Sequence, residues 1–485
     1  MNRRQALRAL GGLWAAGGRE DAGVSAAAAV SRAAAEPPEP IRNGWSCVCV
    51  APGPEGRASL RWQQGVAGPA RLRITVAFDA RENLRVRAVA AKSGETLGSF
   101  DIRFAYPFQP FDVPLSARQA ERVSEEGADL ILEQGNGPLW LLSGAPPEAG
   151  RDLLPHLRRE SRVSGADFEA AFVTPAIAQP FGWMEGCVLD GLQQRWALLR
   201  SQRDREAMDW HFRAFFDGRA MPRYVPHADA PVRHGSEGLL PFAVLAKHDP
   251  AHPSFDGMLE FCGRAAAEMD GVIIDGRTTT AEGCYTLAYP LAALGAARDD
   301  RRLRALAVKQ LEHRIERLAE RSVLYLRANE HGEKTFPNWA RGVAWFFLGL
   351  VRTMNELPPG EIPGSVREAL VWSAELAMKW QNRQGLWHCF IDQPETGVET
   401  SGSAGIAAAL AAGARLLPNP PRAVRAARAA HRELLRRHLV AGGFLGGASQ
   451  ANRDGERLQR SGYRVIAHYG AGLLAQLDAH VRSMS

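Results

Sequence analysis

The spacing of hydrophobic residues changes once along this chain of 485 residues, near residue 165. From Trp45 to about Gly144, apolar and polar residues alternate in short runs, and Gly, Pro, Asn and Asp separate these runs. An alternation of period two is typical of half-buried strands. Several short strands spaced in this way predict an antiparallel β-sandwich, with one hairpin formed by residues 130–132 and 139–142.

After a Pro-rich, charged connector at 146–165, apolar residues recur every three or four positions, which is the pattern of amphipathic helices. The expected helices cover residues 185–200, 203–217, 237–247, 255–269, 282–297, 300–321, 338–356, 365–382, 400–416, 421–438 and 464–482. With a twelfth helix in the connector and no strands between helices, stacked helical hairpins would close into an (α/α)6 barrel. An open helical solenoid is the alternative, but no repeat of fixed length is visible, which favours the barrel.

The length of the chain predicts two domains, because one hydrophobic core rarely serves so many residues. Arg3 and Arg4 precede a short apolar stretch, which resembles a twin-arginine export signal. Export predicts a periplasmic or secreted protein; otherwise the leader is a disordered Ala-rich segment and the protein is cytoplasmic. The expected organisation is a leader at 1–40, a β-sandwich domain with its connector at 44–165 and a barrel domain at 175–485.

Composition argues against several classes of function. The net charge is only +6, and the arginines are rarely clustered in the sequence, so we expect no nucleic-acid partner. No apolar run after the leader is long enough for a membrane span. The six cysteines form no C-x-x-C pair, and no metal-ligand or cofactor motif is present, so we expect neither a metal nor a cofactor. The sequence does not indicate an oligomeric state.

Two of the four segments with chemical potential carry an acid at the start of a helix. Trp183 and Glu185 open the first clear helix, where the acid equally suits the helix dipole. Glu282 and Tyr285 follow a Thr run that can cap the next helix. Glu282 is therefore either a capping-box acid paired with Thr279 or a carboxyl group that faces substrate with a shifted pKa.

The other two segments combine aromatic and polar residues. Trp339 and Trp345 bracket Arg341, whose guanidinium group can hold a carboxylate through two hydrogen bonds; the alternative is two core tryptophans with a solvent-facing arginine. Further along the chain, a Gly turn presents an aromatic residue and a histidine, and an acid and a serine open an Ala-rich helix. These four residues are Trp387, His388, Glu399 and Ser401. Asp229 and Glu237 are further acids, and either also suits a helix cap.

The order of these motifs resembles glycoside hydrolase families 88 and 105, the unsaturated glucuronyl and rhamnogalacturonyl hydrolases. The motifs are Trp-x-Glu-Gly-x-Val-Leu-Asp-Gly-Leu from Trp183, acid-x-x-Tyr from Glu282, Trp-Ala-Arg-Gly-x-x-Trp from Trp339, Gly-Leu-Trp-His from Gly385 and Glu-Thr-Ser-x-Ser-Ala from Glu399. The resemblance covers about residues 175–485. It implies an (α/α)6 barrel that hydrolyses unsaturated, uronic-acid-containing oligosaccharides made by polysaccharide lyases.

The resemblance also implies roles for the candidate residues. Glu282 stands where the family has a catalytic Asp that protonates the C4–C5 double bond, and Asp229 or Glu237 would be the second acid. Arg341 would hold the substrate carboxylate. The other residues expected to bind substrate are Trp183, Glu185, Tyr285, Trp339, Trp345, Trp387, His388, Glu399 and Ser401. A lyase or ordinary glycosidase on the same fold and a catalytically silent sugar-binding homologue are the alternatives, because Glu replaces Asp and Val343 replaces a family Asn.

Overall fold

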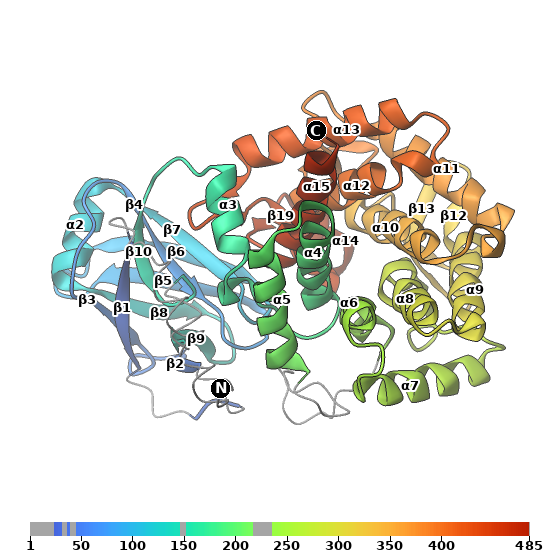
Figure 1. Ribbon diagram of the computed structural model, residues 1–485. Coiled ribbons are helices and arrows are strands. Elements are labelled where there is room, and N and C mark those ends of the chain that lie inside the picture. The colour runs from blue at the N-terminus through green and yellow to red at the C-terminus, as the bar shows by residue number, and fades with distance from the viewer. Residues whose placement is uncertain (1–23, 32–35, 39–44, 146–151, 217–234, 485) are drawn as a thin grey trace, which may run out of the picture. The chain divides into compact units, whose positions relative to one another are not determined.

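The computed structural model of the protein describes residues 24–31, 36–38, 45–145, 152–216 and 235–484. The chain divides into two compact units. Among the described residues, the first contains those up to residue 163 and the short segment 174–177, and the second contains 164–173, 178–216 and 235–484. The first unit consists mainly of strands and the second mainly of helices (Figure 1).

The β unit is built on one antiparallel sheet with the strand order β6-β5-β8-β3-β1-β10-β4-β7, and β2 and β9 form a separate pair. The strands are β1 (Val24–Ser31), β2 (Ser46–Val50), β3 (Ala58–Trp62), β4 (Ala70–Thr75), β5 (Asn83–Ala90), β6 (Thr96–Arg103), β7 (Pro110–Leu115), β8 (Ala128–Gln134), β9 (Leu139–Gly144) and β10 (His156–Arg159), and the unit also holds one helix, α2 (Ala117–Glu126). Strand β5 shows the predicted alternation, because Leu84 and Val86 are buried while Arg85 is exposed. The β-rich N-terminal domain expected from the sequence is therefore confirmed.

The large sheet curls until the strands at its two ends contact each other. Gly98 of β6 lies so close to β7 that an added Cβ would approach Val113 Cγ1 to 2.5 Å. A side chain at this position would push the two strands apart, so the glycine permits the close approach. The core of the unit lies inside this curl, where Ile74, Val86 and Phe100 are almost fully buried.

Two sequence predictions for this unit are wrong. Val24–Ser31 belongs to the leader expected at 1–40, yet it forms β1 and pairs with β3 and β10. Hydrogen bonds of the ladder to both neighbouring strands hold its backbone without an apolar alternation in the sequence. The hairpin expected from residues 130–132 and 139–142 does not form, because β8 pairs with β3 and β5 whereas β9 pairs with β2.

The helical unit follows the predicted helix pattern closely. Its helices are α3 (Gly165–Phe172), α4 (Trp183–Leu199), α5 (Gln202–Phe215), α6 (Leu240–His248), α7 (Ser254–Glu268), α8 (Tyr289–Ala297), α9 (Arg301–Leu318), α10 (Ala340–Glu356), α11 (Gly364–Trp380), α12 (Thr400–Ala412), α13 (Pro420–Arg437), α14 (Gly455–Arg460) and α15 (His468–Ser483). The helix expected in the connector is α3, which begins at its C-terminal end. The helix-rich character of this region is therefore confirmed.

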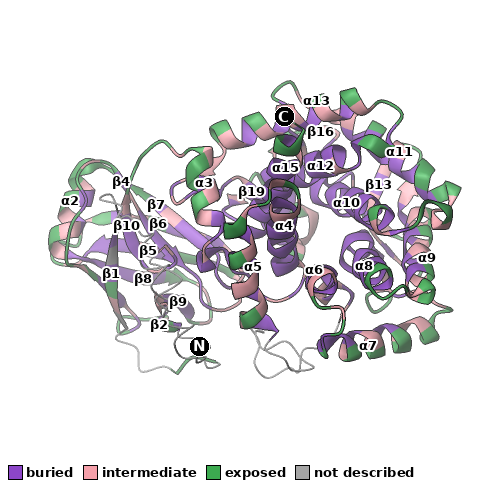
Figure 2. Ribbon diagram, viewed as in Figure 1, coloured by how far each residue is buried: buried purple, intermediate pink, exposed green. Residues whose placement is uncertain are grey.

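Six of these helices are buried on nearly all sides: α4, α6, α8, α10, α12 and α15 (Figure 2). Each contacts the next, and α15 returns to contact α4. Helices that are apolar all round belong in the interior. Small residues allow close packing: a Cβ on Gly405 of α12 would lie 2.7 Å from Ala344 Cβ of α10. Helices α5, α7, α9, α11 and α13 alternate with the buried ones along the chain and keep an exposed face.

A buried polar network ties the inner helices together. Asp190 of α4 accepts hydrogen bonds from Tyr285 Oη at 2.5 Å and from Gln194 Nε2 at 3.1 Å. Its Oδ2 lies 3.1 Å from Nε of Arg352 of α10. Arg352 donates to Gln476 of α15, whose amide in turn donates to Tyr285 Oη. Because breaking a buried ion pair leaves an uncompensated charge, this network fixes how the helices pack.

Short strands lie between the helices, so the prediction of helices without strands is wrong. They are β11 (Thr278–Thr280), β12 (Ala319–Glu320), β13 (Val323–Asn329), β14 (Lys334–Pro337), β15 (His388–Phe390), β16 (Gln393–Val398), β17 (Leu439–Val440), β18 (Phe444–Leu445), β19 (Ala448–Ser449) and β20 (Arg464–Val465). The Thr run pairs with β13 and does not cap a helix, and Thr279 Oγ1 lies 2.9 Å from His313 Nε2. Each pairing spans only a few residues, which is too short to change the dominant helical period.

Within the described residues, no helix combines the length and the apolar content needed to cross a bilayer. In the same part of the chain, no three or more His, Cys, Asp or Glu side chains are grouped to hold a metal ion.

Candidate active site

The chain segments that lead into the inner helices lie close together. Glu237 belongs to a short 3-10 turn, η3 (Ser236–Gly238), directly before α6. A Cβ on Gly182, the residue before α4, would lie 3.6 Å from the Glu237 carbonyl oxygen. The same turn contacts η4 (Cys284–Ala288), the π-helical turn that leads into α8. Residues far apart in sequence therefore converge at the starts of α4, α6 and α8.

Two carboxyl groups, Glu237 and Glu282, share this region. Glu282 is 7% exposed, and its Oε2 has no hydrogen-bond partner within the described residues. Burial raises the pKa of Glu282, while Arg327, a backbone N–H and Arg341 oppose that shift. Burial and the like charge of Glu282 raise the pKa of the half-buried Glu237 to about 7. A carboxyl group with a raised pKa and an open lone pair is suited to exchange protons near neutral pH.

Three charged residues complete the electrostatics of the acid pair. Arg327 of β13 lowers the pKa of both glutamates, and Arg453, in the turn η7 (Asn452–Asp454), lowers that of Glu237. Asp275 acts in the opposite direction on both. These three residues were not among those predicted from the sequence. Arg327 sits in an alternating strand segment, and nothing in its local pattern separates it from a solvent-facing strand residue.

The candidate cation Arg341 lowers the pKa of Glu282 through its charge, but its N–H groups donate to other groups of the protein. Nη1 donates to the carbonyl of Ser449 at 2.7 Å and to the hydroxyl of Tyr469, and Nη2 donates to the carbonyl of Gln450 at 2.8 Å. Its guanidinium carbon lies 4.4 Å from the ring centroid of Trp339. In this arrangement Arg341 holds the segment at 449–450 and supplies positive charge. Its hydrogen-bonding fork is not open to a substrate carboxylate.

Aromatic residues from four elements surround the same region. The Trp183 ring lies 5.5 Å from that of Trp345 and 4.8 Å from that of Tyr469, and the Tyr285 ring stacks on Trp345 at 6.0 Å. Trp345, Tyr285 and Tyr469 are buried, whereas Trp183 is half-buried. Trp183 is therefore the member of this cluster with ring surface to offer a sugar.

Glu185 and Glu399 were expected to bind substrate, but the structure surrounds both with protein donors. Glu185 lies 2.5 Å from His211 Nδ1 and accepts from the backbone N–H of Gln179 at 2.9 Å. Burial raises its pKa, against the effect of His211. Glu399 caps α12, where it accepts from the backbone and hydroxyl of Ser401 and from the N–H of Ser449. Ser401 is fully buried and uses its hydroxyl for this contact, so these residues hold local structure.

The remaining candidates lie apart from the acid pair or outside the described residues. Trp387 is fully buried, and its indole N–H donates to the carbonyl of Ala377 at 2.7 Å, which is typical of a core residue. His388 is half-buried, and burial lowers its pKa. Asp229 lies outside the described residues. Gly342, next to Arg341, packs against Leu326, whose Cδ1 would lie 3.2 Å from an added Cβ.

The model of Glycosyl Hydrolase Family 88 matches residues 285–483, a stretch that includes Arg341 and Trp345 and begins just after Glu282. No curated protein matches the chain.

Solved structures share the fold at low identity. A possible member of family 105 from Salmonella enterica serovar Paratyphi A is 18% identical, with a TM-score of 0.55, and the alignment covers 70% of this chain and 100% of that one. A family 105 glycoside hydrolase from C. acetobutylicum is 15% identical, with a TM-score of 0.55 and coverage of 66% and 99%. A family 88 glycosyl hydrolase from Bacteroides vulgatus is 16% identical, with a TM-score of 0.50 and coverage of 66% and 99%.

The solved structures support the fold, and the family match supports the class of activity. The resemblance to glycoside hydrolase families 88 and 105 predicted from the motifs is therefore confirmed: the family 88 model matches residues 285–483, and solved structures of both families share the fold.

Proposed function

We propose that this chain hydrolyses acidic oligosaccharides whose terminal uronic acid carries a C4–C5 double bond. The observation that carries the proposal is the state of Glu282, a buried carboxyl group with an unpartnered oxygen and a raised pKa beside a second acid. The family match supports the class of substrate. We also propose that the six inner helices and the helices that alternate with them form an (α/α)6 barrel, which the closed series of helix contacts supports.

The chemistry begins with proton transfer from Glu282 to C4 of the vinyl ether. This transfer leaves positive charge shared by C5 and the ring oxygen, next to the uronate carboxylate that C5 already carries. A water molecule adds to C5 and returns one proton to Glu282. The hemiketal then opens by cleavage of the bond between C5 and the ring oxygen, and the resulting hemiacetal at C1 releases the next sugar. One water molecule is consumed, and no group is oxidised or reduced.

Glu237 acts as the positioning acid in this proposal. Two interacting carboxyl groups titrate as a pair, and the charge on one raises the pKa of the other. The pair therefore keeps a proton at a higher pH than a lone glutamate would, which is what a general acid needs. Ordinary glycosidases need two carboxyl groups on opposite sides of a glycosidic bond. The present site needs one acid and a neighbour that keeps it protonated.

We assign substrate contacts to residues near the acids that are exposed or half-buried. Arg327 and Arg453 would neutralise the uronate carboxylate. Both lie close enough to the acid pair to affect it, since Arg327 lowers the pKa of both glutamates and Arg453 lowers that of Glu237. Trp183 would stack against a sugar ring, because it is the half-buried member of the aromatic cluster.

Disaccharides made by polysaccharide lyases test this proposal. The purified protein is expected to remove the absorbance of their conjugated double bond, and Glu282→Gln is expected to abolish that loss. Glu260→Gln, an exposed position on α7, is the matched control and retains activity. A rise in absorbance on polymer would show a lyase instead, and sugar release with the absorbance intact would show an ordinary glycosidase. Either result, or binding without turnover, would overturn the proposal.

A further inference from the structure

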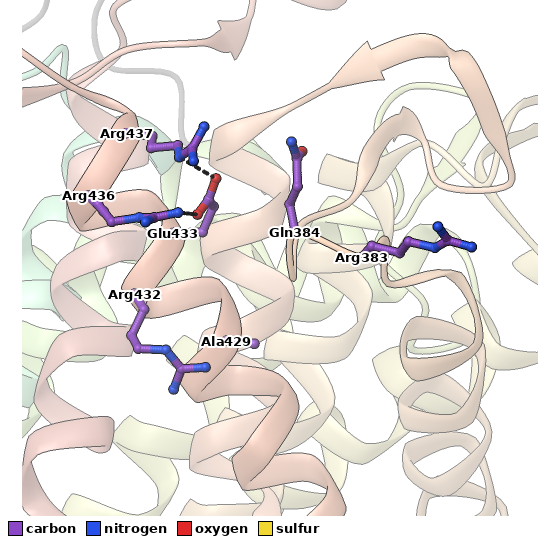
Figure 3. A pocket seen from close by; sticks show the side chains of 7 residues that line it. All are labelled: Arg383, Gln384, Ala429, Arg432, Glu433, Arg436 and Arg437. Atoms are coloured by element: carbon purple, nitrogen blue, oxygen red, sulfur yellow. Dashed lines mark hydrogen bonds and ion pairs between the residues drawn. The ribbon is translucent and has the colours of Figure 1, made fainter.

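A groove of about 540 Å³ lies on the surface of the helical unit, between α13 and the loop that follows α11 (Figure 3). Its lining residues are Arg383, Gln384, Ala429, Arg432, Glu433, Arg436 and Arg437. Figure 3 shows Arg432, Arg436 and Arg437 on α13, with Arg383 and Gln384 on the facing loop. Four of the seven residues carry a guanidinium group, and none of them is used in the proposed acid site.

Fixed backbone contacts hold the two walls of this arginine groove. Gln381 Nε2 donates to the carbonyl of Ala426 in α13 at 2.9 Å and to the carbonyl of Gly385 at 2.8 Å. Gly385 has a φ of +91°, and an added Cβ would lie 2.9 Å from Ala429 Cβ. The loop therefore packs directly on α13 at a residue that must be glycine. Sites built on such rigid elements keep their charges at a fixed spacing.

The positive charge of the groove is poorly balanced. Glu433 is the acidic residue of α13, and it lies 3.3 Å from Arg436 and 3.4 Å from Arg437. Within the described residues, no carboxylate forms an ion pair with Arg383 or Arg432. Because one carboxylate faces four guanidinium groups, the groove has spare capacity for an anion.

The charge continues along the helix beyond the groove. Arg422, Arg425, Arg432 and Arg436 are all exposed. Their spacings of three, seven and four residues place them on one face of the helix. The helix of 18 residues is about 27 Å long. An elongated row of cations matches a chain of regularly spaced anions better than it matches one small anion.

We infer that the arginine groove and this face of α13 form a second binding site, for a polysaccharide chain that carries carboxylates. The inference rests on the proposed function for the choice of polymer. Planar guanidinium groups pair with carboxylates through two hydrogen bonds. The lining contains no aromatic side chain on which bases would stack, which argues against a single-stranded nucleic acid. The site would keep the polymer at the enzyme surface while its ends are processed.

Fluorescence anisotropy with labelled polygalacturonate oligomers tests the inference. The variant Arg383→Gln/Arg432→Gln/Arg436→Gln is expected to weaken binding by at least about tenfold and to reduce its dependence on salt. The matched control is Arg118→Gln/Arg203→Gln/Arg302→Gln, which removes the same charge from exposed positions that do not line the groove. The control is expected to bind within about twofold of the wild type. Circular dichroism checks that both variants are folded.

Three outcomes would overturn the inference: no binding by the wild type, equal losses in the two variants, or tighter binding of a DNA oligomer of equal charge. Turnover of unsaturated disaccharides by the wild type is measured in parallel. Turnover without polygalacturonate binding removes only the second site. Groove-dependent binding without turnover supports the second site and removes only the proposed function.

Discussion

Two buried carboxyl groups of the helical unit, Glu282 and Asp190, are in opposite states. Asp190 accepts hydrogen bonds from Tyr285 and Gln194 and forms an ion pair with Arg352. Glu282 is almost as buried, but its Oε2 has no partner within the described residues, and burial raises its pKa. A carboxylate whose oxygens are all hydrogen-bonded or ion-paired to the protein is a structural element. A buried carboxyl group with an unpartnered oxygen retains a proton and a lone pair for chemistry. The following predictions test this contrast, from the largest expected effect to the smallest.

Glu282→Gln should lower kcat/KM for an unsaturated disaccharide by about 10³-fold, because an amide cannot donate the proton that C4 needs. It should leave the free energy of unfolding nearly unchanged, since no hydrogen bond to Oε2 is lost. Steady-state kinetics measures the loss of kcat/KM, and urea denaturation of the same preparation measures the free energy of unfolding. A large loss of stability alongside the loss of activity would place Glu282 with the structural acids.

Asp190→Asn should lower the free energy of unfolding by about 3 kcal/mol, because Arg352 would then be buried without its counter-charge. Urea denaturation of wild type and variant measures this difference. The double variant Asp190→Asn/Arg352→Gln should recover part of the loss, since the uncompensated charge is removed. A cost below about 0.5 kcal/mol, the range of an ordinary surface substitution, would contradict the structural role.

Glu399→Gln should cost about 2 kcal/mol of stability, because one amide end would point donors at backbone N–H groups that now donate to the carboxylate. Thermal denaturation should show the lower Tm. Glu395→Gln, at an exposed position in the neighbouring strand β16, is the control and should leave Tm unchanged. Equal Tm values for the two variants would show that the cap of α12 is dispensable.

Glu237→Gln should move the basic limb of the pH profile of kcat/KM to lower pH. In the wild type, activity should fall as pH rises through about 7, where the acid pair loses its proton. Removal of the like charge lowers the pKa of the remaining acid. A limb that stays in place would show that Glu237 is not coupled to the catalytic step.

The raised pKa of Glu237 also predicts how stability depends on pH. Its pKa moves from 4.5 to about 7 on folding, so the folded state binds more protons between these values. The contribution of Glu237 to stability is therefore fully present below about pH 4.5 and is lost as pH rises through about 7. Glu237→Gln should flatten this part of a plot of unfolding free energy against pH.

The sequence predicted the helices well, because apolar residues recur every three or four positions throughout this region. It placed Glu237 and Glu282 at two helix starts, which the fold brings together. It did not predict Arg327 or Arg453, since strand β13 and turn η7 reach the acid pair only through tertiary contacts. It also predicted substrate roles for Trp387 and Glu399, whose motifs are compatible with both a binding surface and a core.

The arginine groove is a second feature that was not predicted from the sequence. In the sequence the arginines of α13 lie one to four positions apart, and this spacing alone does not show which of them share an exposed face. The helix gathers them on one face, and the loop at Arg383 adds a charge from 49 positions earlier than Arg432. Charge patterns spaced by helical turns and chain reversals become visible only after folding.

The protonation state of Glu282 is the most direct test of the account. Infrared difference spectra between wild type and Glu282→Gln, recorded from pH 5 to 8, report the carbonyl stretch of a protonated carboxylic acid. The account predicts such a band near neutral pH in the wild type and its loss in the variant. A wild type with only carboxylate bands at Glu282 throughout this range would contradict it.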